Sequence, residues 1–235
     1  MDVAKVDKYV GWVSRWLFAP RCIICSERGD NSIDLCQKCR LQLLDNRSAC
    51  QRCGLPLLAG DRLCGDCLQR PSALTEVHAA YQYGFPLDRL IPRFKFHRDL
   101  VAGKVLAQLM VQGLQALPSP PLLVPVPLHP ARLRQRGYDQ ALELARALAR
   151  QRSIPLRGDL LRRTRDTAPQ SELDAAARKR NLRSAFAAPS SGRLPAHVVL
   201  IDDVMTTGAT LQSAARCLRR AGVERVDAWI CARVI

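Results

Sequence analysis

The most informative stretch of the sequence is Val198-Val199-Leu200-Ile201-Asp202-Asp203-Val204-Met205-Thr206-Thr207-Gly208-Ala209-Thr210. Apolar residues lead into two adjacent carboxylates, a turn of small and hydroxyl residues follows, and the Ala/Leu/Arg periodicity of a helix comes next. This order predicts a buried parallel strand, an acidic pair at its carboxyl end, a loop and a helix N-terminus. Ligands of open α/β sheets bind outside the carboxyl ends of the strands, and helix N-termini offer unpaired N–H groups to phosphate. The stretch therefore predicts a site for a ribose 5-phosphate.

The residue types in this stretch suit a phosphorylated sugar. Gly208 lets the backbone approach a phosphate without an intervening Cβ, and the threonines supply hydroxyl donors. The two carboxylates can accept hydrogen bonds from a ribose diol and attract Mg²⁺, which prefers oxygen ligands. The alternative is an ordinary strand before a helix that is capped by Asp203 or Thr206. A plain cap needs neither the second acid nor three threonines, so the phosphate site is favoured.

The stretch resembles the 5-phospho-α-D-ribosyl 1-diphosphate (PRPP) motif of type I phosphoribosyltransferases, and all its positions fit that motif. The resemblance implies that Asp202 and Asp203 meet the ribose 2′ and 3′ hydroxyls. It also implies that the loop from Met205 to Thr210 wraps the 5-phosphate. The PRPP-binding positions implied after the acidic pair are Val204, Met205, Thr206, Thr207, Gly208, Ala209 and Thr210.

Composition limits the class of protein. A chain of 235 residues with 48% hydrophobic content can hold one full domain with a real core and a small second one. It has no run of eighteen apolar residues, so we expect no transmembrane segment. Charged residues interrupt the N-terminus where a signal peptide would be apolar, so we expect a cytoplasmic protein. The net charge of +15 suits anionic partners, but few aromatic residues lie between the basic ones, so it indicates nucleic-acid binding only weakly.

The cysteine pattern predicts two structural zinc ions. Eight of the ten cysteines form four Cys-x-x-Cys pairs, and the unit Cys-x₂-Cys-x₁₀-Cys-x₂-Cys repeats with a period of 28. In a cytoplasmic chain this pattern indicates zinc rather than disulfides, and four thiolates match tetrahedral Zn²⁺. The simplest assignment is sequential, with Cys22, Cys25, Cys36 and Cys39 in one site and Cys50, Cys53, Cys64 and Cys67 in the other.

Other interpretations of the cysteines stay open at this point. Spacing alone also allows an interleaved assignment, in which the first pair shares its ion with the third. A redox role is the weaker alternative, because four matched pairs exceed what a dithiol needs. We expect the zinc to organise a module too small to fold on its own core. Cys217 and Cys231 lie in apolar contexts and are expected to be core thiols.

The chain divides into three expected segments: an N-terminal amphipathic helix in 1–19, a zinc module in 20–71 and an α/β domain in 72–235. The helix could lie on a membrane surface, but packing of its apolar stripe on the protein is favoured. Strands that alternate with helices predict a doubly wound parallel sheet. Strands are expected near 77–83, 122–126, 160–163, 186 and 226–232 besides the opening one, and helices near 3–18, 87–96, 100–117, 138–150, 174–183 and 211–221. Gly222 is expected to end the last helix.

Two basic loops could complete the ligand site. The first follows the strand that ends near 126 and carries Arg132, Arg134 and Arg136. The second begins at Arg162, and its irregular, polar character suits a lid that closes over a ligand. Arginine presents fork-like donors to phosphate oxygens. We therefore expect Arg136 and Arg165 to be the residues that stabilise a leaving pyrophosphate.

Further motifs make the resemblance specific. In order, the chain has the cysteine pairs, Pro-Val-Pro-Leu-His at 125–129, Arg-Gly-Tyr-Asp-Gln at 136–140, Arg-x-Thr with a later Gln, Arg-Lys-Arg-Asn-Leu at 178–182, Ala-Phe at 185–186 and the acidic-pair motif. Together they resemble the ComF/GntX family, which joins a double zinc ribbon to a type I phosphoribosyltransferase domain, over almost the whole chain. Phe-Lys-Phe at 94–96 resembles a family signature whose lysine, here Lys95, would point at the ligand. Asp139 departs from the usual Asn, and would either weaken anion binding or orient Arg136.

The resemblance implies two possible functions. As an enzyme, the protein would bind PRPP with Mg²⁺ and transfer the phosphoribosyl group to an unknown nitrogen acceptor, with Asp202, Asp203, Arg136 and Arg165 as its catalytic residues. The sequence shows no recognisable acceptor pocket. As a binding module, it would hold a nucleotide, PRPP or single-stranded DNA as an accessory of the DNA-uptake machinery. The family is associated with the uptake or use of external DNA, so DNA-uptake proteins are expected partners in both cases.

Overall fold

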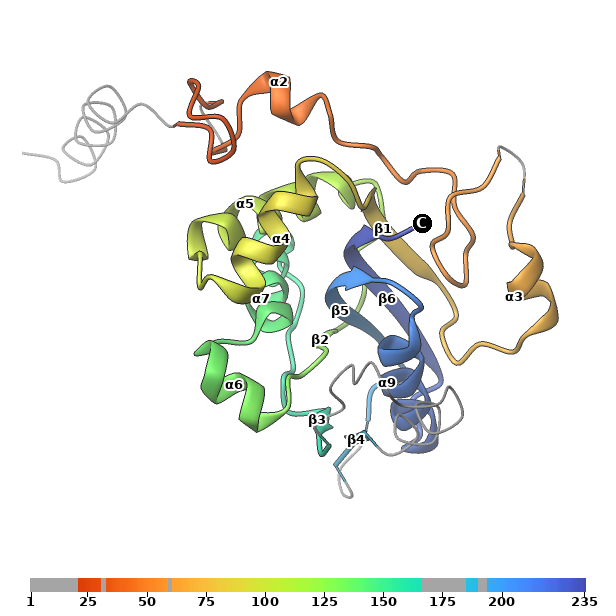
Figure 1. Ribbon diagram of the computed structural model, residues 1–235. Coiled ribbons are helices and arrows are strands. Elements are labelled where there is room, and N and C mark those ends of the chain that lie inside the picture. Colours follow the sequence, from red (N-terminus) through yellow and green to blue (C-terminus); the bar gives the residue numbers. More distant parts are fainter. Residues whose placement is uncertain (1–20, 31–32, 59–60, 166–184, 190–193) are drawn as a thin grey trace, which may run out of the picture.

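The computed structural model describes residues 21–30, 33–58, 61–165, 185–189 and 194–235 (Figure 1). A four-stranded parallel sheet with the order β1-β6-β5-β2 forms the framework of the α/β domain. Its strands are β1 (Val77–Gln82), β2 (Leu123–Pro125), β5 (His197–Met205) and β6 (Arg225–Arg233). A separate antiparallel pair joins β3 (Arg162–Arg163) to β4 (Phe186–Ala187). The predicted parallel-sheet class is confirmed.

Helices cover both faces of the sheet, as a doubly wound fold requires (Figure 1). One face carries α4 (Leu87–Phe96), α5 (Leu100–Gly113) and α7 (Gln140–Arg152), and the other carries α9 (Ala209–Arg220). The apolar run in the first half of β5 is explained by burial on both faces of the sheet. Val199 and Ile201 belong to the core on the α5 side, whereas Val198 and Leu200 belong to the core on the α9 side. A strand buried on both faces needs apolar residues at every position.

Three element predictions need correction. Strand β5 continues through the acidic pair to Met205, because β6 keeps pairing with it as far as Arg233. The basic turn after residue 129 is instead a short helix, α6 (Pro130–Arg136), which His129 caps and Gly137 ends with a φ of 87°. Helix α5 ends at Gly113 rather than at residue 117. Gly222, with a φ of 107°, follows α9 as predicted, and the helices expected at 3–18 and 174–183 lie outside the described residues.

The zinc module contains two short helices, α2 (Gln37–Arg40) and α3 (Gly65–Gln69), one in each ribbon. The segment between the ribbons runs along the edge of β1, where Asp45 and Tyr81 form an antiparallel bridge and Gln82 N–H donates to the Leu44 carbonyl. This pairing covers an edge strand that would otherwise expose free backbone groups. The first ribbon packs into the core on the α5 side, and the second packs through Cys53 against the core on the α9 side. Within the described part of the chain, no helix combines the length and apolar character needed to cross a membrane.

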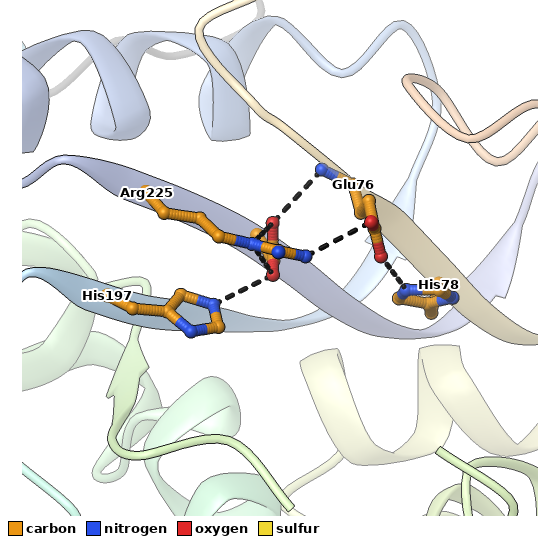
Figure 2. Close-up of polar contacts among 5 residues, drawn as sticks. Glu76, His78, His197 and Arg225 are labelled. Atoms are coloured by element: carbon orange, nitrogen blue, oxygen red, sulfur yellow. Dashed lines mark hydrogen bonds and ion pairs between the residues drawn. The ribbon is translucent and has the colours of Figure 1, made fainter. Parts of the chain in front are cut away.

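A polar cluster joins the amino-terminal ends of β1, β5 and β6 (Figure 2). The side chain of Asp227 is buried and accepts hydrogen bonds from the Glu76 N–H at 3.1 Å and from Arg225 Nε at 2.9 Å. His197 Nε2 lies 2.8 Å from its second oxygen. Arg225 also pairs with Glu76, which accepts from His78 Nε2. This cluster lies at the end of the strands opposite the acidic pair and was not predicted from the sequence.

We expect Asp227→Ala to lower the free energy of unfolding by about 2–3 kcal/mol, because it leaves several partly buried donors without their shared acceptor. Urea denaturation monitored by circular dichroism measures the effect. Asp159→Ala is the matched control, since Asp159 forms an exposed pair with Arg157. That change should leave the unfolding midpoint nearly unchanged. Equal losses in the two variants would show that the cluster contributes no more than a surface ion pair.

Candidate functional site

The acidic pair lies at the carboxyl end of β5, next to the last turn of α4. Lys95 Nζ from α4 lies 2.9 Å from Asp203 Oδ1, which also accepts from the Val204 N–H at 2.7 Å. The other oxygen, Asp203 Oδ2, is buried and has no hydrogen-bond partner among the described residues. A buried carboxylate oxygen is costly to leave without a partner. The geometry therefore suits a ligand hydroxyl or a cation at Oδ2. Lys95 and Asp203, both predicted to belong to the ligand site, lie in direct contact.

Asp202 differs from its neighbour in its electrostatics. Its Oδ1 accepts from the Asp203 N–H at 2.9 Å. Burial, reinforced by the adjacent Asp203 carboxylate and opposed by Lys95, raises the pKa of Asp202 to about 8. The pair thus holds one carboxylate stabilised by a lysine and one carboxyl group that keeps its proton at neutral pH. A bound cation would favour ionisation of the second group.

We expect Asp202→Asn to stabilise the protein at alkaline pH and not at acid pH. An unfolded aspartate ionises near about pH 3.9, whereas folded Asp202 keeps its proton up to about pH 8. The stability of the wild type therefore falls between these pH values, and the full loss is reached above the folded pKa. Asparagine cannot ionise, so the variant should gain about 1–2 kcal/mol at pH 9 and nothing near pH 4, after allowance for partial solvent exposure. Urea denaturation of both proteins at pH 4, 6.5 and 9 measures the difference, and a gain that is the same at all three would contradict the assignment.

The predicted phosphate loop connects β5 to α9. Thr206 and Thr207 are exposed, and Gly208 is the N-cap residue of α9, in the left-handed conformation with a φ of 74°. The positive φ of this turn requires glycine, and a Cβ on Gly208 would also lie 2.2 Å from Met205 Cε and displace the end of that side chain. No side chain in the described part of the chain caps this helix, and Ala209 N–H has only a 3.4 Å contact with Thr207 Oγ1. The helix N-terminus is therefore available to an anion.

The other predicted loop positions belong to the regular elements on either side. Val204 and Met205 are the last residues of β5, and Met205 is buried beneath the loop. Ala209 and Thr210 form the first turn of α9. The loop proper is thus shorter than the sequence suggested.

The last turn of α4 also contacts the first of the two predicted basic loops, through Tyr138 and Arg136. The Phe94 ring stacks on Tyr138 at 5.3 Å between centroids, and the Tyr138 hydroxyl donates to the Phe94 carbonyl. The Arg136 guanidinium lies 5.3 Å above the centre of the Phe96 ring and donates to Gln140 Oε1 at 2.8 Å. Because Lys95 lies between the two phenylalanines, one helical turn places both predicted cationic residues. Gln140 was not among the predicted site residues, although its motif was recognised.

Asp139 caps a helix, a role that was not predicted from the sequence. The expectation that it weakens anion binding stays a prediction. One carboxylate oxygen of Asp139 accepts from the Leu128 N–H at 2.8 Å, and the other accepts from the Leu142 N–H at 3.1 Å. It thereby caps α7 and ties the segment after β2 to that helix. Burial raises the pKa of Asp139. The suggestion that it orients Arg136 is wrong, because Arg136 pairs with Gln140; an asparagine would offer only one acceptor oxygen to these two donors.

The second basic segment is not brought to the site in the described part of the chain. Arg165 is exposed and lies two residues after the end of β3. Among the described residues, no hydrogen bond or ion pair joins it to the acidic pair or to the phosphate loop. Gln170 and the basic run at 178–181 lie outside the described residues. The role expected of Arg165 stays a prediction.

The sulfur atoms of the eight paired cysteines form two groups, and within each group all ligand atoms lie within 4.8 Å of one another. The sulfurs of Cys25 and Cys36 are 3.6 Å apart, and those of Cys53 and Cys64 are 3.7 Å apart. Tetrahedral Zn²⁺ with Zn–S bonds of about 2.3 Å requires sulfurs about 3.8 Å apart. Both groups therefore fit zinc, in the sequential arrangement. The groups are Cys22, Cys25, Cys36 and Cys39, and Cys50, Cys53, Cys64 and Cys67.

The two remaining cysteines are core thiols, as predicted. Cys217 and Cys231 are both buried, and burial raises the pKa of each thiol. Arg233 is also buried, and its side chain donates hydrogen bonds to main-chain carbonyls at the phosphate loop. No motif in the sequence around Arg233 predicted this role.

Both the zinc module and the α/β domain are similar in sequence to known proteins. A family model described as a double zinc ribbon domain matches residues 13–68, and one described as a phosphoribosyl transferase domain matches residues 138–233. The chain is 36% identical to Competence protein F of Haemophilus influenzae over 72% of this chain and 78% of that protein. It is 34% identical to the DNA utilization protein YhgH of Escherichia coli K12 over 91% of this chain and 90% of that protein. Among solved structures, it is similar to an orotate phosphoribosyltransferase from Aeropyrum pernix, with 21% identity and a TM-score of 0.36 over 63% of this chain and 64% of that one.

Proposed function

The chain belongs to the ComF/GntX family of proteins with a double zinc ribbon and a phosphoribosyltransferase domain, and on this premise we propose that it binds PRPP together with Mg²⁺. The observation that carries the proposal is the buried Asp203 Oδ2, which lacks a partner among the described residues and lies on the strand that leads into the N-terminus of α9. A ribose hydroxyl supplies the donor that Oδ2 lacks, and a 5-phosphate suits the helix N-terminus.

The proposed reaction is transfer of the phosphoribosyl group to a nitrogen acceptor. The C1–O bond to pyrophosphate breaks, the leaving oxygen keeps the electron pair, and the acceptor nitrogen forms the C1–N bond and releases a proton. Mg²⁺ would be held near Asp202 and Asp203 and would neutralise charge on the pyrophosphate. The acidic pair orients the ribose, while Lys95 and Arg136 add positive charge beside the leaving group. Such catalysis depends on positioning and electrostatics more than on a covalent nucleophile.

A second candidate is a binding module that holds PRPP, a nucleotide or single-stranded DNA without turnover. Two observations favour it: the net charge of +15, and relatives named for competence and for DNA utilization. Its partners would then be DNA or DNA-uptake proteins, and we propose that it acts in the cytoplasm. Electrostatic binding of DNA would weaken steeply as salt is raised.

Calorimetric titration of the full chain with PRPP, with and without Mg²⁺, tests the ligand assignment. Pyrophosphate release is then followed across a panel of bases and amines. Binding with turnover on any acceptor supports the enzyme, and binding without turnover supports the module. Absence of PRPP binding in the presence of Mg²⁺ would overturn the proposed ligand.

A further inference from the structure

Arg233, at the end of β6, joins the second zinc ribbon to the phosphate loop. Its side chain is buried, with 8% of the residue exposed. Nε donates to the carbonyl of the zinc-ligand residue Cys53 at 2.8 Å. Nη1 donates to the carbonyls of Met205 at 3.2 Å and Thr206 at 2.6 Å, and also to that of Val234. We propose that Arg233 is a positioning residue that couples occupancy of the second zinc site to the affinity of the phosphate loop.

The peptide groups of the loop explain how Arg233 would act on a phosphate. In a planar trans peptide, the C=O and the following N–H point in opposite directions. The guanidinium draws the carbonyls of Met205 and Thr206 toward itself, so the N–H groups of Thr206 and Thr207 are turned away from it. Both threonines are exposed. Successive N–H groups with this orientation make an anion-binding concavity, and Arg233 holds that orientation before a ligand arrives.

The charge of Arg233 makes its acceptors indispensable. A guanidinium stays ionised in proteins, and a buried charge must be compensated by hydrogen bonds. Among the described residues, the partners of Arg233 are main-chain carbonyls, one in the zinc ribbon and the others in the loop and at the end of the chain. If the Cys53 carbonyl moves, the guanidinium must find another acceptor, and the loop carbonyls move with it.

The position of the Cys53 carbonyl depends on the fold of the second ribbon. Cys50 and Cys53 belong to one group of zinc ligands, and the Gly54 N–H donates to the Cys50 carbonyl at 2.8 Å. Gly54 has a φ of 66°, and its carbonyl accepts from buried Asn46 at 2.9 Å. A metal that gathers the four sulfurs fixes this turn. Loss of that metal would release the turn and, through Arg233, the loop.

The coupling is tested on the full chain through its affinity for zinc, because linkage makes the coupling between two binding equilibria reciprocal. The equilibrium partition of zinc between the protein and a chromophoric chelator is measured with and without ribose 5-phosphate, whose own affinity is measured by calorimetry. In the wild type, we expect ribose 5-phosphate to raise the affinity for one of the two zinc ions roughly five- to a hundredfold. Unchanged affinity for both ions, with ribose 5-phosphate bound, would overturn the proposal without the use of any variant.

Variants of Arg233 test whether this residue carries the coupling between the zinc site and the loop. Arg233→Gln should weaken ribose 5-phosphate binding about tenfold or more and abolish the effect of that ligand on zinc affinity, and Arg233→Lys should restore part of both effects. Arg152→Gln is the matched control, because Arg152 also donates to main-chain carbonyls, those of Leu114 and Leu117, but away from the loop. It should leave the affinity for ribose 5-phosphate and the effect of that ligand on zinc affinity unchanged. Equal behaviour of Arg233→Gln and Arg152→Gln would contradict the role of Arg233.

The inference rests on the proposed function, but the two can fail separately. Absence of binding of both PRPP and ribose 5-phosphate to the wild type would reject the proposed function itself. Binding of ribose 5-phosphate without any effect on zinc would reject the coupling alone.

Discussion

Replacement of Cys36 with serine is expected to reduce bound zinc from two ions per chain to one and to destabilise the protein by several kcal/mol. Cys36 belongs to the first group of ligands and caps α2, and its neighbour Leu35 is fully buried in the core shared with α4 and α5. Structural zinc contributes on the order of 10 kcal/mol to the folding of small zinc domains. Loss of the ion should therefore expose that part of the core.

Elemental analysis of the purified protein gives the zinc content, and urea denaturation gives the stability. Cys217→Ser is the matched control, because Cys217 is equally a buried thiol but belongs to neither ligand group. We expect this variant to keep both ions. Two ions in Cys36→Ser, or a single ion in Cys217→Ser, would contradict the assignment of the sites.

Local patterns made much of this molecule predictable from its sequence. The cysteine spacing and the loop around Gly208 could be read directly, because a metal knuckle and a phosphate turn each depend on residues that lie close together in the chain. The parallel sheet was predictable for a related reason, since a strand buried on both faces must be apolar throughout. The sequential grouping of the sulfurs needed the structure, because spacing alone is compatible with both arrangements.

Features that depend on contacts between distant segments were not predictable. Arg233 is one arginine among many in the sequence, and its partner Cys53 is separated from it by 180 positions. Asp227 likewise acquires its role only where β1, β5 and β6 come together. The extension of β5 through the acidic pair depends on pairing with β6, which outweighs the local preference of Asp203 for a turn. Helix α6 was missed because its signals, Pro130 and Gly137, are also those of a turn.

Asp203→Asn is expected to weaken PRPP binding about 100- to 1,000-fold. The carboxylate pairs with Lys95 through Oδ1 and leaves Oδ2 for a ligand. Asparagine has nearly the same shape but removes the charge and offers an NH₂ group in place of one acceptor oxygen. A hydrogen bond to a charged group contributes about 1.5–3 kcal/mol, and loss of about 3–4 kcal/mol, the lower end of the range for two such interactions, corresponds to the expected change in affinity.

Calorimetry with PRPP and Mg²⁺ measures this effect, and the fold of the variant is verified by its unfolding midpoint. Asp159→Asn removes an exposed carboxylate far from β5 in the sequence and should leave the affinity unchanged. Lys95→Met gives an independent check, because it leaves the buried Asp203 carboxylate without its cation and should favour the protonated, non-binding form. Its PRPP affinity should therefore rise with pH more steeply than that of the wild type. An affinity of Asp203→Asn within threefold of the wild type would show that PRPP binds without this carboxylate, and the ligand site would then have to lie elsewhere.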